Sequence, residues 1–183
     1  MTQLFRTLEQ QKQEFKSGKL LATPIAGLVA WFIVGIGGVF LSNTGKVWIL
    51  FIATGSIVYL GMFVSKFTGE NFLDKTKPKN TFDKLFFFTA GQAILVYSIA
   101  IPFFLVDYSS LPLTVGILSG LMWLPLTWII DHWVGAFHAI ARTVIVLFLW
   151  YLFPQHRFVA IPFAIVIMYI VTIVILMNRK VRC

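Results

Sequence analysis

The sequence has 183 residues, of which 58% are hydrophobic and 12% charged, and its mean hydropathy is +0.86. Soluble globular domains carry about 25% charged residues, so this composition excludes an ordinary soluble domain and indicates one membrane domain. The net charge of +8 leaves two classes of acidic partner to compare, a nucleic acid and an anionic membrane surface.

The first 21 residues are mostly polar, and they place Leu4, Leu8 and Phe15 on roughly one face of a helix. This pattern is typical of a short amphipathic helix on the cytoplasmic surface of a membrane. The first apolar run starts late, is of full length and lacks a small-residue cleavage site. We therefore expect the segment to be retained and not removed as a signal peptide.

Six apolar runs follow, each near the roughly 20 residues that a helix needs to cross about 30 Å of hydrocarbon. They cover residues 22–42, 46–67, 84–106, 111–130, 134–153 and 158–178. The runs are continuous and do not alternate, which favours helices over the strands of a β-barrel. The sequence therefore predicts an all-α fold, a six-transmembrane-helix bundle over 22–178 followed by a short tail over 179–183, within a single domain of residues 1–183.

Two features modify this simple picture of six straight helices. Pro125 lies inside the fourth run, where it removes a backbone hydrogen bond and is expected to kink the helix. The longest connection, residues 68–83, mixes both charge signs with Gly and Pro and is typical of a solvated loop.

The basic residues are distributed very unevenly about the six spans. Nearly all Lys and Arg lie on the side that holds both termini, while Lys46 and Arg157 lie on the other side and Arg142 within the fifth span. The positive-inside rule then predicts a multi-pass protein of the cytoplasmic membrane with both termini in the cytoplasm. Such a side attracts anionic lipid headgroups, which explains the net charge without any nucleic-acid partner.

The fifth span contains the stretch DHWVGAFHAIART, which is unusually polar for a membrane helix. Asp131, Gly135, His138 and Arg142 fall on one helical stripe, and small residues keep this part of the helix slim. At 1.5 Å per residue, Arg142 lies about 12 Å into the span, near the middle of the membrane. An arginine there costs about 2.5–3.5 kcal/mol on insertion scales, so it is expected to face protein, water or an interface.

Arg142 has no acidic partner at its own depth, because Asp131 is about 16 Å away along the helix. Polar residues at similar depth are Gln92, Tyr59 and Tyr169, together with Ser56 and Ser119. An uncompensated guanidinium group suits an anion, a carboxylate, a phosphate-bearing lipid or a polarisable carbonyl. The alternative is structural: Arg142 bonds helix carbonyls, Gln92 and water, or lies at an oligomer interface.

His138 has two similar interpretations, a proton or ligand role and a hydrogen bond within the core. The histidines at 132, 138 and 156 form no i,i+4 pair, and the single cysteine, Cys183, is remote, so we expect no metal and no cofactor. Paired carboxylates, H-E-x-x-H and a serine triad are absent from the sequence, which argues against an enzyme. In an enzyme, Asp131, His132 and His138 would be the acid and base candidates.

Small residues in the fourth span indicate close helix packing. Gly116 and Gly120 form a G-x-x-x-G pattern, which makes a homo-oligomer through this face plausible.

Three segments, FTGENFLDKTKPKNTFDKL, GILSGLMWLPLTWIID and FPQHRFVAIPFAIVIMYIVT, together with the six-span layout, resemble an uncharacterised family of small bacterial integral membrane proteins, a domain of unknown function. The resemblance implies a bacterial cytoplasmic membrane and brings no activity, substrate or catalytic residue.

Two classes of function remain open from the sequence. The first is a small transporter or channel for a small anionic or polar solute, with Arg142, His138, Gln92, Asp131, His132, Tyr59 and Tyr169 as the candidate ligand or permeation residues. The second is a non-transporting lipid-binding, sensory or scaffold protein, in which the polar layer is structural. Water access to the middle of the fifth helix distinguishes the two.

Overall fold

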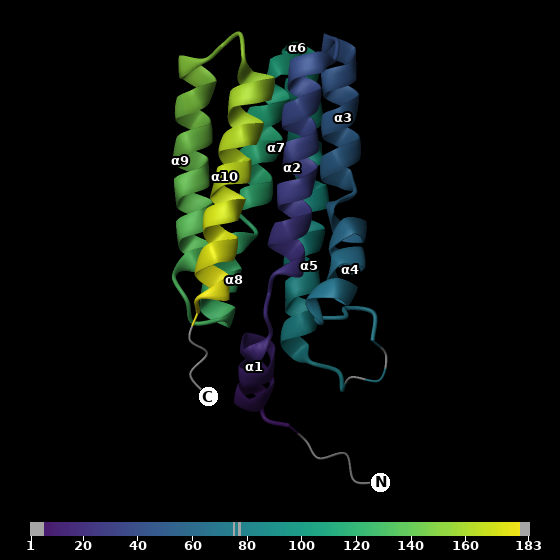
Figure 1. Cartoon of the computed structure of the whole chain (residues 1–183), viewed down its shortest axis with the longest axis vertical. Coiled ribbons are helices and arrows are strands. Elements are labelled where there is room, and N and C mark those ends of the chain that lie inside the picture. The colour runs from purple at the N-terminus through teal and green to yellow at the C-terminus, as the bar shows by residue number, and fades with distance from the viewer. Residues whose placement is uncertain (1–5, 75, 77, 180–183) are drawn as a thin grey trace.

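The computed structural model describes residues 6–179 apart from 75 and 77, and these residues form helices and no strands (Figure 1). The elements are α1 (Leu8–Ser17), α2 (Ala22–Phe40), α3 (Asn43–Gly55), α4 (Ile57–Thr68), α5 (Thr81–Leu95), α6 (Tyr97–Val106), the short 3-10 helix η1 (Tyr108–Ser110), α7 (Leu111–Gly120), α8 (Trp123–Ile129), α9 (Val134–Leu152) and α10 (Arg157–Met177). The all-α prediction is confirmed, and every predicted apolar run is helical.

Within the described residues, five helical stretches are long and apolar enough to cross a membrane, and the bent pair α3–α4 makes a sixth when counted as one span. Large apolar side chains are exposed along the outside of the bundle, among them Phe40, Phe67, Leu105, Val106 and Phe148. Soluble monomers rarely expose so much apolar surface. The chain is therefore compatible with a multi-pass membrane protein.

Side chains cap the backbone at the starts of some of the helices. Ser42 and Asn80 accept hydrogen bonds from the first turns of α3 and α5, and Asp107 does the same for η1. Gly69 ends α4 in the left-handed region, with φ of 81°, where a side chain would be strained.

Three of the stretches are interrupted near their middle, and α2, α9 and α10 are not. The predicted kink at Pro125 is confirmed: the helix breaks into α7 and α8 at Leu121 and Met122, because the proline cannot donate to the carbonyl four residues earlier. The predicted span over 46–67 is helical, with a bend that the sequence pattern did not predict. The chain bends by 49° between α3 and α4, at the Gly55–Ser56 pair, a combination that commonly marks sharp kinks.

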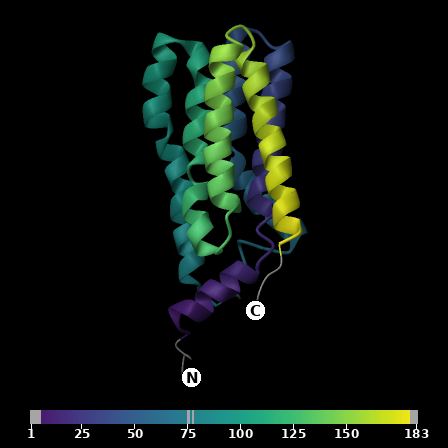
Figure 2. The ribbon, with the colours of Figure 1, turned by 90° about the vertical axis from the view of Figure 1, so that its left-hand side faces the viewer.

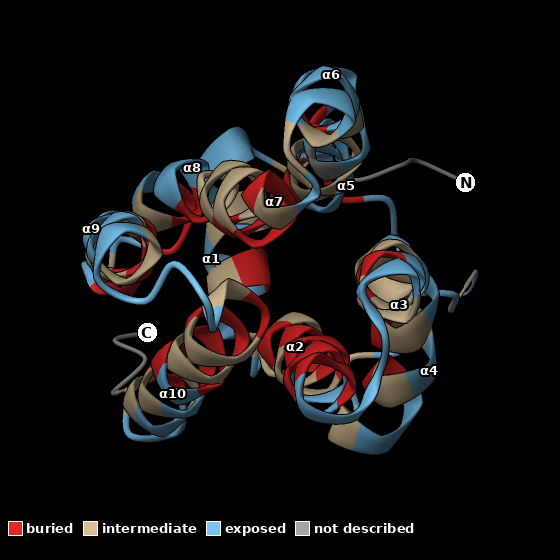
Figure 3. Cartoon of the chain, turned by 90° about the horizontal axis from the view of Figure 1, so that it is seen from above, coloured by how far each residue is buried: buried red, intermediate tan, exposed pale blue. Residues whose placement is uncertain are grey.

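The closest packing in the bundle is between α2 and α10 (Figure 3). A Cβ atom at Gly38 would lie 2.0 Å from the carbonyl oxygen of Phe158, so only glycine allows the two backbones to approach this far. Trp31, Ile161 and Ile165 are fully buried between these helices and their neighbours. The buried residues face the bundle interior in Figure 3, and the exposed ones face outwards.

The predicted N-terminal helix is present as α1, which lies across one end of the bundle (Figure 2). Lys12 and Lys16 bind the two carboxylate oxygens of Asp131 at 2.8 and 3.2 Å, and the guanidinium of Arg179 donates to the backbone carbonyl of Lys16 at 2.7 Å. Phe15 is buried against the bundle. The helix therefore docks on protein, while residues 1–5, including Leu4, and 180–183 lie outside the described residues.

We call this the α1 end and the opposite end the far end. The connection between α8 and α9, the loop before α5 and the end of α10 all meet α1 there, through Asp131, Asn80 and Arg179. At the far end, Arg157 pairs with Asp107 at 3.4 Å and lies over the Trp150 ring.

Replacing Gly38 by Ala tests the close packing of α2 and α10. We expect Gly38→Ala to lower the free energy of unfolding by about 1–3 kcal/mol, because the new methyl group overlaps a backbone carbonyl that cannot move aside. Gly91→Ala is the matched control: no atom lies within 4 Å of the added Cβ, so it should stabilise the helix by about 0.5–1 kcal/mol. Thermal melting in detergent measures both, and equal melting temperatures would contradict this packing.

Candidate functional site

The centre of the bundle holds one arginine with three polar neighbours. Arg142 of α9 is fully buried, and its Nη1 donates to the Tyr169 hydroxyl of α10 at 3.1 Å and to Nε2 of His138 at 3.4 Å. Its Nη2 donates to the hydroxyl of Ser119 of α7 at 3.0 Å. Arg142, His138, Tyr169, Ser119 and the neighbouring Thr172 form what we call the Arg142 cluster.

The surrounding helices are shaped to hold the guanidinium group. A Cβ at Gly120 would lie 3.0 Å from Cδ of Arg142, so this glycine gives the side chain its room. The guanidinium carbon lies 5.3 Å from the Trp31 ring of α2 and 5.4 Å from the Tyr169 ring, within the range of cation–π attraction. In the described part of the chain, no carboxylate pairs with Arg142.

The hydrogen bonds define the state of His138. Because a guanidinium group only donates, Nε2 must accept, and the ring proton must be on Nδ1. Nδ1 lies 2.7 Å from the hydroxyl of Thr172, which itself donates to the carbonyl of Met168 at 2.8 Å. His138 is therefore a neutral imidazole with one tautomer, held in place by α10 and by the Trp123 ring at 4.6 Å.

A cavity of about 80 Å³, which we call the central cavity, adjoins the Arg142 cluster. Since one water molecule needs about 10–15 Å³ of such volume, the space accommodates several. The polar side chains on its wall all carry hydroxyl groups: Thr23, Thr54, Tyr97, Ser119 and Tyr169. Two of them, Ser119 and Tyr169, are the groups that accept hydrogen bonds from Arg142. The cavity and the buried charge are thus separated by a single layer of hydroxyls.

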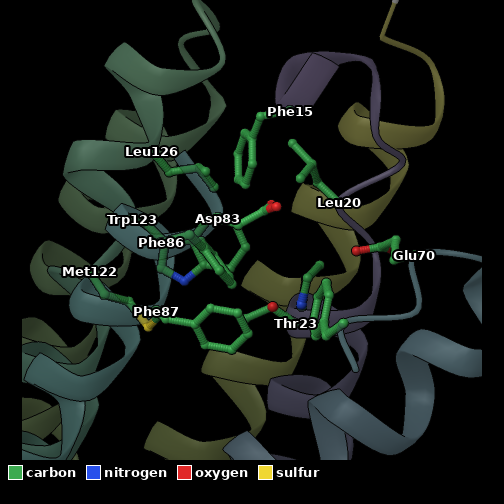
Figure 4. A pocket seen from close by; sticks show the side chains of 12 residues that line it. Phe15, Leu20, Thr23, Glu70, Asp83, Phe86, Phe87, Met122, Trp123 and Leu126 are labelled. Atoms are coloured by element: carbon green, nitrogen blue, oxygen red, sulfur yellow. The ribbon is translucent and has the colours of Figure 1, made fainter. Parts of the chain in front are cut away.

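A smaller cavity of about 30 Å³, the α1-end cavity, adjoins the central one (Figure 4). The two share lining residues, namely Thr23, Phe72, Phe86, Phe87 and Met122. Phe15 of α1 and Leu20 face this space in Figure 4. Glu70 also lines it, and its carboxylate accepts from the backbone N–H groups that begin α2. Together the two cavities lead from beneath α1 to the Arg142 cluster.

On the far-end side of the central cavity, aromatic side chains pack together around Tyr97. The Tyr97 hydroxyl lies 2.6 Å from that of Thr54, which ties α6 to α3. The Phe51 ring lies 5.7 Å from the Tyr97 ring and 6.0 Å from the Phe104 ring. In the described structure, a second cavity therefore adjoins the central one toward the α1 end, and packed aromatic rings lie toward the far end.

The structure brings together only three of the residues that the sequence predicted for the site. Arg142, His138 and Tyr169 are in contact. Tyr59 is 73% exposed on the outside of α4, and Gln92 is exposed on α5, so neither meets Arg142. The prediction of a layer containing Tyr59 and Gln92 is wrong because equal depth says nothing about which way a side chain faces.

Asp131 and His132 lie at the α1 end, away from Arg142. Asp131 has left-handed backbone geometry and precedes α9, so it does not belong to the predicted helical stripe. The hydrogen bond from Lys12 holds the pKa of the Asp131 carboxyl below its usual value. Burial and then the positive charge of Arg179 lower the pKa of His132, whose Nδ1 accepts from the N–H of Val134. Asp131 thus ties α1 to the connection before α9, and His132 accepts from the first turn of α9.

The small residues of the predicted G-x-x-x-G pattern are used inside the chain. A Cβ at Gly116 would meet Ile165 of α10 at 3.2 Å, and Gly120 faces Arg142. Gly135 likewise lets α9 approach the backbone of α8. These positions are occupied within one bundle, and a homo-oligomer remains a prediction.

Several residues of the site went unrecognised in the sequence. Thr172 of the cluster and Trp31 beside it had no signal beyond ordinary membrane-helix composition, and Gly120 was singled out for helix packing but not for its contact with Arg142. Ser119 did have a signal in the sequence, because its depth along its span matches that of Arg142.

Comparison with known proteins gives one family. Residues 8–179, from the start of α1 to just beyond α10, match the model described as a family of unknown function, DUF7010. The match confirms the resemblance to an uncharacterised family. No curated protein and no solved structure matches the chain significantly.

The tautomer of His138 gives a direct test of the cluster. In ¹⁵N-histidine spectra of the protein in micelles at neutral pH, we expect a neutral ring protonated on Nδ1 at position 138. Thr172→Val removes its acceptor and should shift that resonance, whereas Thr114→Val, whose hydroxyl donates to backbone carbonyls one turn earlier, should not. An imidazolium, or a proton on Nε2, would show that Arg142 does not donate to the ring.

Proposed function

We propose that this chain, which belongs to the DUF7010 family, is a small transporter or channel that binds a small anionic or polar solute in the central cavity. One observation carries the proposal: Ser119 and Tyr169 line this cavity and also accept the hydrogen bonds of Arg142. The buried positive charge can thus act on a solute through two hydroxyl groups, although Arg142 itself is not exposed.

The division between straight and interrupted helices supports this proposal. The interrupted stretches α3–α4, α5–α6 and α7–α8 all contribute to the wall of the central cavity. Secondary transporters commonly bind their substrates near the middle of the membrane, where helices are discontinuous. The unbroken α9 and α10 hold most of the Arg142 cluster, so a bent half can move against a straight half during transport.

The cavities suggest which side is accessible in this conformation. The α1-end cavity adjoins the central cavity toward α1, and the rings of Phe51, Tyr97 and Phe104 pack together on the far-end side, where we infer that they form a barrier. Transport would require this aromatic barrier to open, with the α1 end closing in turn.

We also propose the orientation and location of the protein. The α1 end carries Lys12, Lys16 and Arg179, and the far end carries Lys46 and Arg157 near the helix starts. By the positive-inside rule the α1 end faces the cytoplasm, in the cytoplasmic membrane of a bacterium, and its basic residues contact anionic headgroups.

A second candidate function is a non-transporting lipid-binding, sensory or scaffold role with a structural polar layer. It is favoured by one observation, that both Nη atoms of Arg142 already have protein partners while the residue has zero exposure. Water in the central cavity is what separates the two candidates.

Cysteine labelling tests the proposal. In a Cys183→Ser background, Ala90→Cys places a thiol on the wall of the central cavity. Val144→Cys places one on the outer surface of α9, which would face lipid, at a residue that is 61% exposed. A charged, membrane-impermeant thiol reagent is applied from either side of oriented vesicles. We expect Ala90→Cys to react from the cytoplasmic side and Val144→Cys to react from neither.

Small anions supplied in the medium should slow labelling at position 90 if the cavity binds them. Failure of Ala90→Cys to react from both sides, with the variant shown to be folded, would overturn transport in favour of the structural or lipid-binding role. Labelling without protection by any anion or polar solute would place water in the cavity but contradict a solute site there.

A further inference from the structure

The hydroxyl groups on the wall of the central cavity differ in how their protons are used. Ser119 accepts from Arg142 and donates to the carbonyl of Val115. Thr54 donates to the carbonyl of Leu50 at 2.6 Å, so its contact with Tyr97 must be one in which Tyr97 donates. The protons of these three hydroxyl groups therefore already have acceptors within the protein. The hydroxyl of Thr23, which lines both cavities, has no hydrogen-bond partner among the described residues, so its proton is free.

The hydroxyl of Tyr169 also has a free proton, and of these two hydroxyls only that of Tyr169 contacts Arg142. Its oxygen accepts from Nη1 of Arg142 at 3.1 Å, and because a guanidinium group cannot accept, the phenolic proton is not used in that contact. Among the described residues no acceptor lies within hydrogen-bond distance of this proton. Since Tyr169 lines the central cavity, its O–H group is available to a molecule there, and the charge behind it strengthens it as a donor.

The remaining wall of the central cavity is apolar. Ile57, Val58 and Met62 of α4 face Phe86 and Ile94 of α5 across it, and none of the described residues that line it is charged. A molecule that fits this space needs an apolar body and a single acceptor group at the Tyr169 end.

We propose that the ligand of the central cavity is a small carboxylate with an apolar body, bound with a carboxylate oxygen accepting from the Tyr169 hydroxyl. This inference rests on the proposed function, in which the cavity binds the solute. Arg142 compensates the negative charge from behind the hydroxyl layer, and the hydrocarbon body lies between α4 and α5. The Tyr169 hydroxyl is the group that favours a ligand carrying a hydrogen-bond acceptor over one that carries none.

The same wall disfavours the two neighbouring ligand classes. An inorganic anion would lose its hydration on nearly every side and regain at most two donors, the hydroxyls of Tyr169 and Thr23, which does not offset the loss. A neutral alcohol of equal length fills the apolar space, and its oxygen can also accept from Tyr169, but it carries no negative charge for Arg142 to compensate and therefore gains less. The preference for the carboxylate over the alcohol therefore measures the contribution of the Tyr169 and Arg142 pair.

Calorimetric titration of the purified full chain in detergent at pH 7.5 tests this inference, with hexanoate, 1-hexanol and inorganic phosphate as probes. We expect hexanoate to bind at least about tenfold more tightly than 1-hexanol, the effect of one hydrogen bond to a charged group. Tyr169→Phe should remove most of this preference, because it weakens hexanoate, which accepts with a full negative charge, much more than 1-hexanol. Tyr97→Phe removes another cavity hydroxyl, whose proton is used by Thr54, and should retain the preference.

Equal affinities of the wild-type chain for hexanoate and 1-hexanol, or tighter binding of phosphate, would overturn the carboxylate assignment without the use of any variant. A preference that survives Tyr169→Phe would remove Tyr169 from the account. These failures are distinct from failure of the proposed function: position 90 would still label from the cytoplasmic side and be protected by another solute. An unlabelled cavity that binds no probe would overturn both.

Discussion

A guanidinium group buried in an apolar bundle without a carboxylate partner is the constraint on which the rest of the site depends. The charge of Arg142 must be stabilised by dipoles and π-systems, because an unpaired charge in such surroundings costs several kcal/mol. The chain supplies these from four helices: α2 through Trp31, α7 through Ser119, α9 through His138 and α10 through Tyr169. Each partner is neutral, so the charge stays uncompensated within the described residues and its field extends into the cavity beside it.

This constraint also accounts for the asymmetry of the bundle. The helices that hold most of the cluster, α9 and α10, run without interruption, and α2 packs against α10 through glycines that allow backbone contact. The stretches on the other side of the central cavity are bent or broken at Ser56, at Val96 and at Leu121 and Met122. A precise hydrogen-bonding cluster needs rigid support, whereas a cavity that admits a solute needs walls that can move.

Much of the fold could be predicted because membrane helices are marked by long apolar runs, and the ends found in the structure lie within a few residues of those expected. The kink near Pro125 was predictable since its cause is local. The bend at Ser56 was missed, because a Gly–Ser pair permits a kink without requiring one. The docking of α1 was missed as well, since Lys12 and Asp131 are 119 residues apart in the chain.

The site was predictable only in part, for a geometric reason. The depth of a residue follows from its position along a span, and this correctly grouped Arg142, Tyr169 and Ser119. The rotation of one helix about its axis relative to another does not follow from the sequence pattern of apolar spans. Tyr59 and Gln92 have suitable depth but face outwards.

The most direct test of the central claim, that the Arg142 charge serves the cavity, is the Arg142→Met variant carrying Ala90→Cys. Because Arg142 has no carboxylate partner, its replacement by an apolar residue of similar length leaves no buried countercharge unpaired, and the lower cost of burial offsets the lost hydrogen bonds. The account predicts that the variant keeps its melting temperature and still labels at position 90, while protection by small anions disappears. A variant that loses its fold, or one that keeps full protection by anions, would show that the charge serves the bundle alone.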